Sequence, residues 1–206
     1  MPTERFLRLS EEKKAAILRA SMDEFSRVPS DKVSINQIIK NAEISRGSFY
    51  TYFEDKMDLL RYIFQDTKQQ YQDFCRKSLV ENNGDFWKMV EDMFHEVLYK
   101  EYSSQLARLI RNVLTYAEAE KFVGMLRESC GDGCSMDEWM YERVDKSSLR
   151  TETLEEFRVL SEMCMMAVVM AFFQKNKDGK AIDAVEQTFF RKINILKYGA
   201  LKHKEN

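Results

Sequence analysis

Apolar residues recur at helical spacing along almost the whole chain, and short polar stretches separate the segments that carry them. This pattern predicts a first helix at residues 11–27, two short helices at 35–42 and 46–52, and a long helix at 54–81. Further helices are predicted at residues 85–100, 103–117, 119–128, 135–144, 151–174 and 181–201. With only two prolines and seven glycines in 206 residues, the fold is expected to be all-α.

The two short helices are separated by only residues 43–45. Ser34 precedes the first helix and Ser45 the second, and serine at such a position accepts a backbone N–H of the first turn. Because the connection is so short, the second helix must cross the first steeply and expose its outer face. The B-DNA major groove is wide enough to admit a helix presented in this way. The segment is therefore predicted to be a helix-turn-helix.

The residues in and around this motif follow the pattern of a known family. The first sixty residues resemble the TetR family of bacterial one-component repressors. Two positions depart from the family: Glu43 stands where glycine is usual, and residues 27–30 replace a Gly-aromatic pair. Glu43 in a positive-φ turn would cost about 1 kcal/mol relative to glycine. The matching residues are Ile17, Ala20, Phe25, Ser34, Ile35, Ile38, Ala42, Ile44, Ser45, Gly47, Phe49, Tyr50, Tyr52, Phe53, Lys56, Leu59 and Leu60.

The resemblance implies an N-terminal three-helix DNA-binding domain, residues 1–53, and a C-terminal helical domain for ligand binding and dimerisation, residues 54–206. The expected protein is a ligand-responsive repressor that binds a palindromic operator in double-stranded DNA. A single recognition helix touches few base pairs, so a homodimer is expected to supply two half-sites. The alternative is a helical ligand-binding or adaptor protein whose N-terminal hairpin contacts protein instead of DNA.

The helix-turn-helix offers several polar groups to a groove. Arg46 can bind guanine O6 and N7 bidentately, Ser48 can reach a base edge or a phosphate, and Gly47 lets the backbone approach closely. Asn36 and Gln37, early in the preceding helix, are expected to add a base edge and a phosphate.

The second motif helix also carries aromatic residues, with Tyr50 and Tyr52 expected to face outward and Phe49 and Phe53 inward. By the family resemblance, Tyr50 is expected to contact phosphate. Lys56, at the start of the next helix, is expected to bind phosphate together with the N–H groups of that helix. Ordinary surface and packing roles are the alternative for all of these residues. The full predicted DNA-binding set is Ser34, Asn36, Gln37, Ser45, Arg46, Gly47, Ser48, Tyr50, Tyr52 and Lys56.

Overall charge counts modestly against a nucleic-acid partner, since 32 Lys and Arg face 34 Asp and Glu. The local field at the docking face matters more, and Lys40, Arg46 and Lys56 are expected near that face. Non-specific affinity should accordingly be weak. With two histidines, no phosphate loop and no nucleophile elbow, neither catalysis nor a cofactor is expected.

Four cysteines raise the question of metal or redox chemistry. Cys130 and Cys134 flank a Gly-Asp-Gly segment at a spacing that a metal site could use. A complete tetrahedral set would need improbable further ligands, so no metal is expected. The chain begins without a signal peptide and has no apolar run of roughly 18 residues, which predicts a cytoplasmic protein with reduced thiols and no membrane partner.

The C-terminal half is expected to hold both the effector site and the dimer interface. Core packing is the default role for its methionines and aromatic residues, yet the family implies a cavity, and soft side chains suit a small apolar effector. The apolar residues of helices 151–174 and 181–201 wrap more of each helix than one-sided packing needs, which predicts a four-helix bundle between subunits. The pocket candidates are Met163, Met165, Met166, Met170, Phe86, Trp87, Phe94, Tyr116, Phe122 and Trp139.

Overall fold

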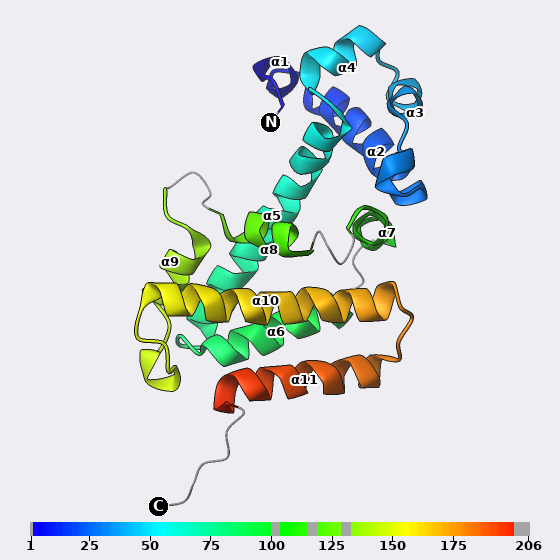
Figure 1. Ribbon diagram of the computed structural model, residues 1–206. Helices are drawn as coiled ribbons and strands as arrows, with labels where there is room; N and C mark the ends of the chain where they lie inside the picture. The colour runs from blue at the N-terminus through cyan, green and yellow to red at the C-terminus, as the bar shows by residue number, and fades with distance from the viewer. Residues whose placement is uncertain (1, 100–103, 115–118, 129–132, 200–206) are drawn as a thin grey trace, which may run out of the picture. The chain divides into compact units, whose positions relative to one another are not determined.

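The computed structural model describes residues 2–99, 104–114, 119–128 and 133–199, and every regular element in these ranges is helical (Figure 1). The all-α prediction is confirmed. None of the helices in these ranges is both long enough and apolar enough to cross a membrane. The helices are α1 (Glu4–Leu7), α2 (Glu11–Arg27), α3 (Ile35–Asn41), α4 (Arg46–Tyr52), α5 (Lys56–Glu81), α6 (Phe86–Tyr99), α7 (Ser104–Val113), α8 (Ala119–Arg127), α9 (Met136–Tyr141), α10 (Leu154–Asn176) and α11 (Ile182–Tyr198), with 3-10 turns η1 (Ser30–Lys32) and η3 (Lys146–Ser148).

The chain forms two compact units, and α5 runs through both of them. Unit 1 joins Met1–Lys68 with Tyr102–Thr115, and unit 2 joins Gln69–Glu101 with Tyr116–Asn206. These units do not coincide with the predicted division at residue 53. The reason is tertiary: α7 packs along α2, and the Asn112 amide donates to the carbonyl oxygen of Ser26 at 2.7 Å. The functional division into two domains remains a prediction.

In unit 1, serine caps set where the helices begin. Ser10, Ser34 and Ser45 each accept a backbone N–H of the first turn of α2, α3 and α4. Glu43, in the turn between α3 and α4, has φ 53°, the left-handed conformation predicted for it. The helices then bury one apolar core, whose members include Phe6, Ile17, Ala20, Phe25, Ile38, Phe49, Phe53, Leu59, Leu109 and Val113.

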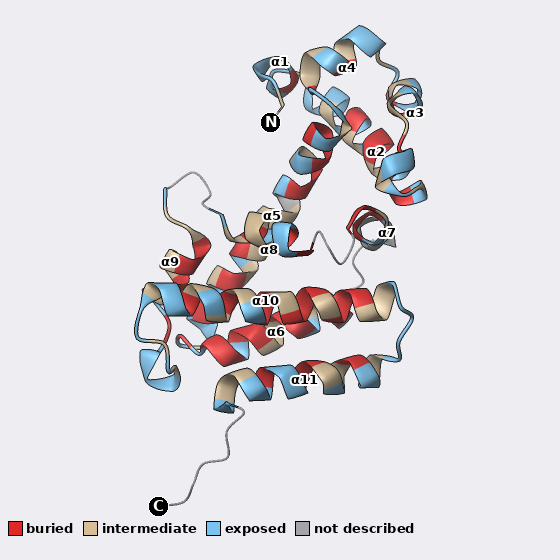
Figure 2. Cartoon of the chain, in the orientation of Figure 1, coloured by how far each residue is buried: buried red, intermediate tan, exposed pale blue. Residues whose placement is uncertain are grey.

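In unit 2, α10 is the central helix and packs against α6, α8, α9 and α11. Figure 2 shows buried residues along most of α10 and along the facing side of α6. Phe94 of α6 stacks on Phe189 of α11 with ring centroids 3.9 Å apart. Reciprocal side-chain and backbone hydrogen bonds at Ser135 and Thr153 start α9 and α10.

A buried ion pair joins three helices of unit 2. The Arg127 guanidinium of α8 lies 2.9 Å from the Asp137 carboxylate of α9, and their side chains are only 10% and 6% exposed. Ser161 of α10 donates to Asp137 at 2.8 Å, and Arg127 also pairs with Glu162 at 2.7 Å. Burial alone would lower the pKa of Arg127, but the hydrogen bonds to Asp137 and Glu162 raise that pKa above its ordinary value. The guanidinium therefore stays charged inside the unit.

Candidate nucleic-acid interface

The start of α4 is fixed by two hydroxyl groups. The Ser48 backbone N–H donates to Ser45 Oγ at 3.0 Å, and the two side-chain oxygens are 2.8 Å apart. Ser34 caps α3 in the same way, accepting from the Gln37 backbone N–H at 3.3 Å, and its own N–H donates to the buried Glu24. The capping roles predicted for Ser34 and Ser45 are confirmed. Contacts of these serines with DNA remain predictions.

Arg46 belongs to an exposed cluster that links α3 to α4. Its Nη1 donates to Asn36 Oδ1 at 2.7 Å, its Nη2 lies 3.5 Å from the Tyr50 hydroxyl, and the guanidinium is 5.5 Å from the centre of the Tyr50 ring. All three residues are exposed. Both partners are neutral, so the positive charge of Arg46 is held in place without being cancelled. The cluster therefore holds the Arg46 guanidinium in a fixed orientation on the exposed surface of α4, where a ligand can reach it.

The face of α4 directed away from the core is centred on two residues. Successive residues of a helix turn by about 100°, so Gly47 and Thr51 lie opposite the fully buried Phe49. Thr51 was not among the predicted contacts, although its spacing from Phe49 and Gly47 could have identified it. Its hydroxyl donates to the Gly47 carbonyl oxygen at 2.8 Å. A Cβ built on Gly47 would meet only Ser45 Oγ, at 3.9 Å, so packing within the protein does not require glycine there.

Gln37 lies on α3 beside this face and is half-buried. Its amide nitrogen donates to Asn41 Oδ1 at 2.8 Å, one turn further along the same helix. The amide oxygen of Gln37 is left for another partner. The contact with phosphate that was predicted for this side chain remains a prediction.

The outward orientation predicted for Tyr52 is wrong. Its side chain is half-buried, and its ring packs edge-on against Phe6 with centroids 6.0 Å apart. Phe6 belongs to α1, a four-residue helix that the sequence pattern did not predict. A segment this short carries too few residues to show helical periodicity. Tyr52 therefore supports α4 from its inner side.

In the structure Lys56 has other partners than the phosphate predicted for it. Its ammonium group donates to the backbone carbonyl oxygens of Ser30, Asp31 and Val33 at 2.8, 3.1 and 3.4 Å. An ammonium has only three N–H donors, so the loop before α3 occupies all of them. Lys56 therefore fastens that loop to the start of α5.

The N-terminus of α5 is likewise already occupied by acidic side chains. Asp55 accepts the Asp58 backbone N–H at 2.7 Å, and Asp58 accepts the Glu54 N–H at 3.3 Å. Asp55 satisfies one backbone donor in the first turn of α5, and the two carboxylates repel a phosphate. The predicted phosphate site at the start of α5 is therefore not supported.

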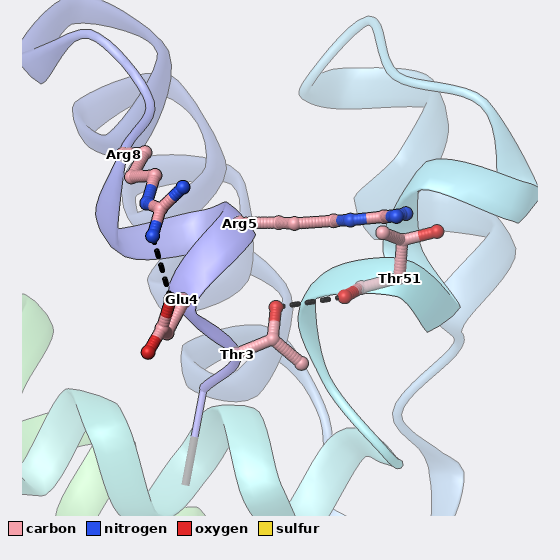
Figure 3. A pocket seen from close by; sticks show the side chains of 5 residues that line it. All are labelled: Thr3, Glu4, Arg5, Arg8 and Thr51. Carbon is pink, nitrogen blue, oxygen red and sulfur yellow. Dashed lines mark hydrogen bonds and ion pairs between the residues drawn. The ribbon is translucent and has the colours of Figure 1, made fainter.

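An open hollow of about 510 Å³ lies beside the C-terminal end of α4 (Figure 3). Its lining consists of polar and charged residues from α1, from the two residues that flank α1, and from α4. Sequence reasoning missed this hollow because it missed α1. The lining residues are Thr3, Glu4, Arg5, Arg8 and Thr51.

The pocket candidates in the C-terminal half occupy different environments. Most are part of the packed interior, in keeping with the default role of core packing. Tyr116 lies outside the described residues. Phe86, Trp87, Phe94, Phe122 and Met165 are buried, Trp139, Met166 and Met170 are half-buried, and Met163 is exposed.

The cysteines differ in burial and hence in reactivity. Burial raises the pKa of the Cys75 and Cys164 thiols to about 12. Both therefore remain protonated and unreactive near neutral pH. Cys134 is half-buried, and its partner in the predicted pair, Cys130, lies outside the described residues. Within the described ranges, no group of three or more His, Cys, Asp or Glu residues is arranged to hold a metal ion.

A capped helix-turn-helix with an exposed, arginine-bearing second helix defines a class of DNA-binding regulators, and comparison with known proteins identifies the family. Residues 17–63 match the family described as bacterial regulatory proteins, tetR family, and residues 85–200 match the tetracyclin repressor-like C-terminal domain. The second match alone covers more than half of the chain. The chain therefore belongs to the TetR family, whose members are transcriptional regulators and not enzymes.

Individual relatives are more distant. The chain is 31% identical over 80 residues to YvdT of Bacillus subtilis (strain 168), an uncharacterised HTH-type transcriptional regulator; this covers 39% of the chain and 41% of YvdT. A TetR family transcriptional regulator from Chloroflexus aurantiacus J-10-FL has 22% identity and a TM-score of 0.46, with 97% of this chain and 98% of that chain covered. A TetR regulator from Rhodococcus sp. RHA1 has 16% identity and a TM-score of 0.44, with 94% and 100% covered.

Proposed function

We propose that this protein is a repressor that binds a palindromic operator in double-stranded DNA as a homodimer and is released by a small apolar effector. The observation that carries the DNA-binding part is the Arg46 cluster, in which neutral partners hold a charged fork on the exposed side of α4. Repression, as opposed to activation, is supported by the match to a tetracyclin repressor-like domain.

Within the proposed interface, different residues of α4 contact the bases and the phosphates. Arg46 reads a guanine, and Asn36 orients it from α3. Tyr50 donates its hydroxyl to a phosphate, while Gly47 and Thr51 form the surface that approaches the groove most closely. Lys56 and Tyr52 act indirectly, because they hold the loop and the helix that position these groups.

Replacing Arg46 with alanine is expected to relax base preference at one operator position by about 1–3 kcal/mol. Asn36→Ala should lose part of the same preference, since it frees the guanidinium to move. Selection of binding sites from random duplexes, run on the wild type and both variants, measures this directly. Unchanged base preference in Arg46→Ala would show that Arg46 does not contact a base. Failure of the wild type to enrich any sequence would favour the alternative in which the N-terminal hairpin contacts protein.

Gly47→Ala is expected to separate stability from DNA binding. Alanine should stabilise α4 by up to about 1 kcal/mol, because the added methyl group meets no close neighbour and glycine is a poor helix former. The same methyl group would keep the helix away from DNA, so affinity should fall several-fold. Gly124→Ala in α8 is the matched control, since its Cβ also meets nothing within 4 Å. Equal DNA affinity of the two variants would contradict close approach at Gly47.

The effector is proposed to bind within unit 2 and to act through α5. This helix is continuous from Lys56 to Glu81 and begins only a few residues after α4 ends. A shift of its distal part therefore moves α4. Because the two half-sites of the operator have a fixed spacing, the two α4 helices of the dimer then no longer fit both half-sites, and affinity for the operator falls. Coupling of about 1–3 kcal/mol is typical of such linkage. Titration of the selected operator with the protein, with and without candidate apolar compounds, tests the effector. A true effector weakens operator binding, and an unrelated compound does not.

A further inference from the structure

We propose that α1 carries a second, separate DNA contact, in which a backbone phosphate binds in the hollow formed by Arg5, Arg8 and Thr51. The inference rests on the proposed DNA-binding function and extends the interface beyond the helix-turn-helix. Three features support it: α1 is held rigidly against α4, its arginines keep their charge available, and the hollow adjoins the outward face of α4.

The short helix α1 is held in place by its neighbours. Phe6 is fully buried, with ring centroids 4.7 Å from Phe53 and 5.1 Å from Tyr62. Thr3 adds two hydrogen bonds to the end of α4: its N–H donates to the Tyr52 carbonyl oxygen at 3.0 Å and its hydroxyl to the Thr51 carbonyl oxygen at 2.8 Å. Four residues do not form a stable helix alone, so this docking is what fixes the position of the arginines.

Two guanidinium groups and one carboxylate line the hollow. Arg5 is exposed and extends from α1 toward Thr51 (Figure 3). No hydrogen bond or ion pair joins Arg5 to another of the residues that the structure describes. Arg8 pairs with Glu4 at 2.7 Å, but both side chains are largely exposed, and a pair in water is weak. The hollow thus carries a net positive charge with unused N–H donors.

The position of the hollow points to DNA as the source of the phosphate. Thr51 lines the hollow and also lies at the centre of the α4 face opposite Phe49. When that face enters the major groove, the backbone that borders the groove must pass beside the end of α4. Guanidinium groups bind phosphate oxygens bidentately, and the hollow is open to solvent, so a phosphodiester can reach it without displacing protein.

The test uses a labelled duplex of about 30 base pairs and mixed sequence, because a phosphate contact acts on every sequence. Binding is followed by fluorescence anisotropy across a salt series. Arg5→Gln should weaken binding several-fold at low salt and make the slope of log K against log salt shallower by about 0.9 for each subunit that contacts the duplex. Glu4→Gln removes the opposing charge and should strengthen binding. Lys77→Gln, which removes an exposed positive charge from α5, is the control and should behave as wild type.

A further variant tests whether docking of α1 matters. Thr3→Val removes the hydrogen bond to Thr51 and should reproduce part of the loss of DNA affinity that Arg5→Gln causes. Adding Arg5→Gln to Thr3→Val should then lower DNA affinity by a smaller factor than Arg5→Gln does in the wild type. Thermal melting confirms that each variant is folded. If Arg5→Gln matches Lys77→Gln while the wild type binds DNA, the α1 contact is overturned and the proposed function stands. If the wild type binds no duplex even at low salt, both are overturned.

Discussion

Asp137→Ala is expected to lower the free energy of unfolding by about 3–5 kcal/mol. The change leaves the Arg127 guanidinium without its buried partner, in a place where water reaches only 10% of the side chain. Ser161 loses the acceptor of its hydroxyl at the same time. A buried ion pair is costly to form, but removing one partner alone is far more costly, because the remaining charge is poorly solvated and keeps only the half-exposed Glu162 as an ion-pair partner.

Two further variants isolate this cause. The adjacent Glu138→Gln breaks a half-exposed pair with Arg158 and should cost no more than about 1 kcal/mol. Replacing both partners, as Arg127→Met with Asp137→Leu, should restore most of the stability that Asp137→Ala loses, since no charge is then buried. Urea unfolding at one fixed protein concentration gives all three values. A loss below about 1 kcal/mol for Asp137→Ala would contradict the buried ion pair as a main stabiliser of unit 2.

The sequence predicted the helices well because their signals are local. Ser10 and Ser45 mark the starts of α2 and α4, and apolar spacing carries each helix to its end, so the predicted ranges 11–27 and 46–52 agree with the structure. The ion pair was not predictable in this way. Asp137 reads as an ordinary acidic residue in the first turn of a helix, and only packing of α8, α9 and α10 brings it to Arg127.

The same distinction explains which parts of the candidate site were predicted. Arg46 could be placed on the exposed side of α4 from periodicity within one helix. The role of Lys56 depends on carbonyl groups 23 to 26 residues earlier in the chain, which no local pattern indicates. The orientation of Tyr52 depends on Phe6, in a helix too short to detect. Errors at the site therefore arise where a side chain serves a distant segment.

A charged side chain at position 163 is expected to separate the proposed dimer into monomers. On α10, Val159 and Met163 are one turn apart and are 59% and 49% exposed, and on α11 Ile195 and Tyr198 are exposed as well. The two helices pack in opposite directions, so the first half of α10 lies beside the last half of α11 (Figure 1). All four residues lie in these neighbouring halves of α10 and α11, which a second copy is proposed to cover.

Met163→Glu would bury an unpaired carboxylate in that interface, which costs about 2–5 kcal/mol and raises the dimer dissociation constant roughly 30-fold or more. Val80→Glu on α5 is the matched control, because Val80 is 65% exposed and lies outside α10 and α11. Sedimentation measures the assembly state, and anisotropy with the selected operator measures the consequence. Because each monomer reaches only one half-site, Met163→Glu should bind the full operator no better than a half-site. An intact dimer in Met163→Glu, together with dissociation in Val80→Glu, would move the interface from the α10 and α11 pair to α5.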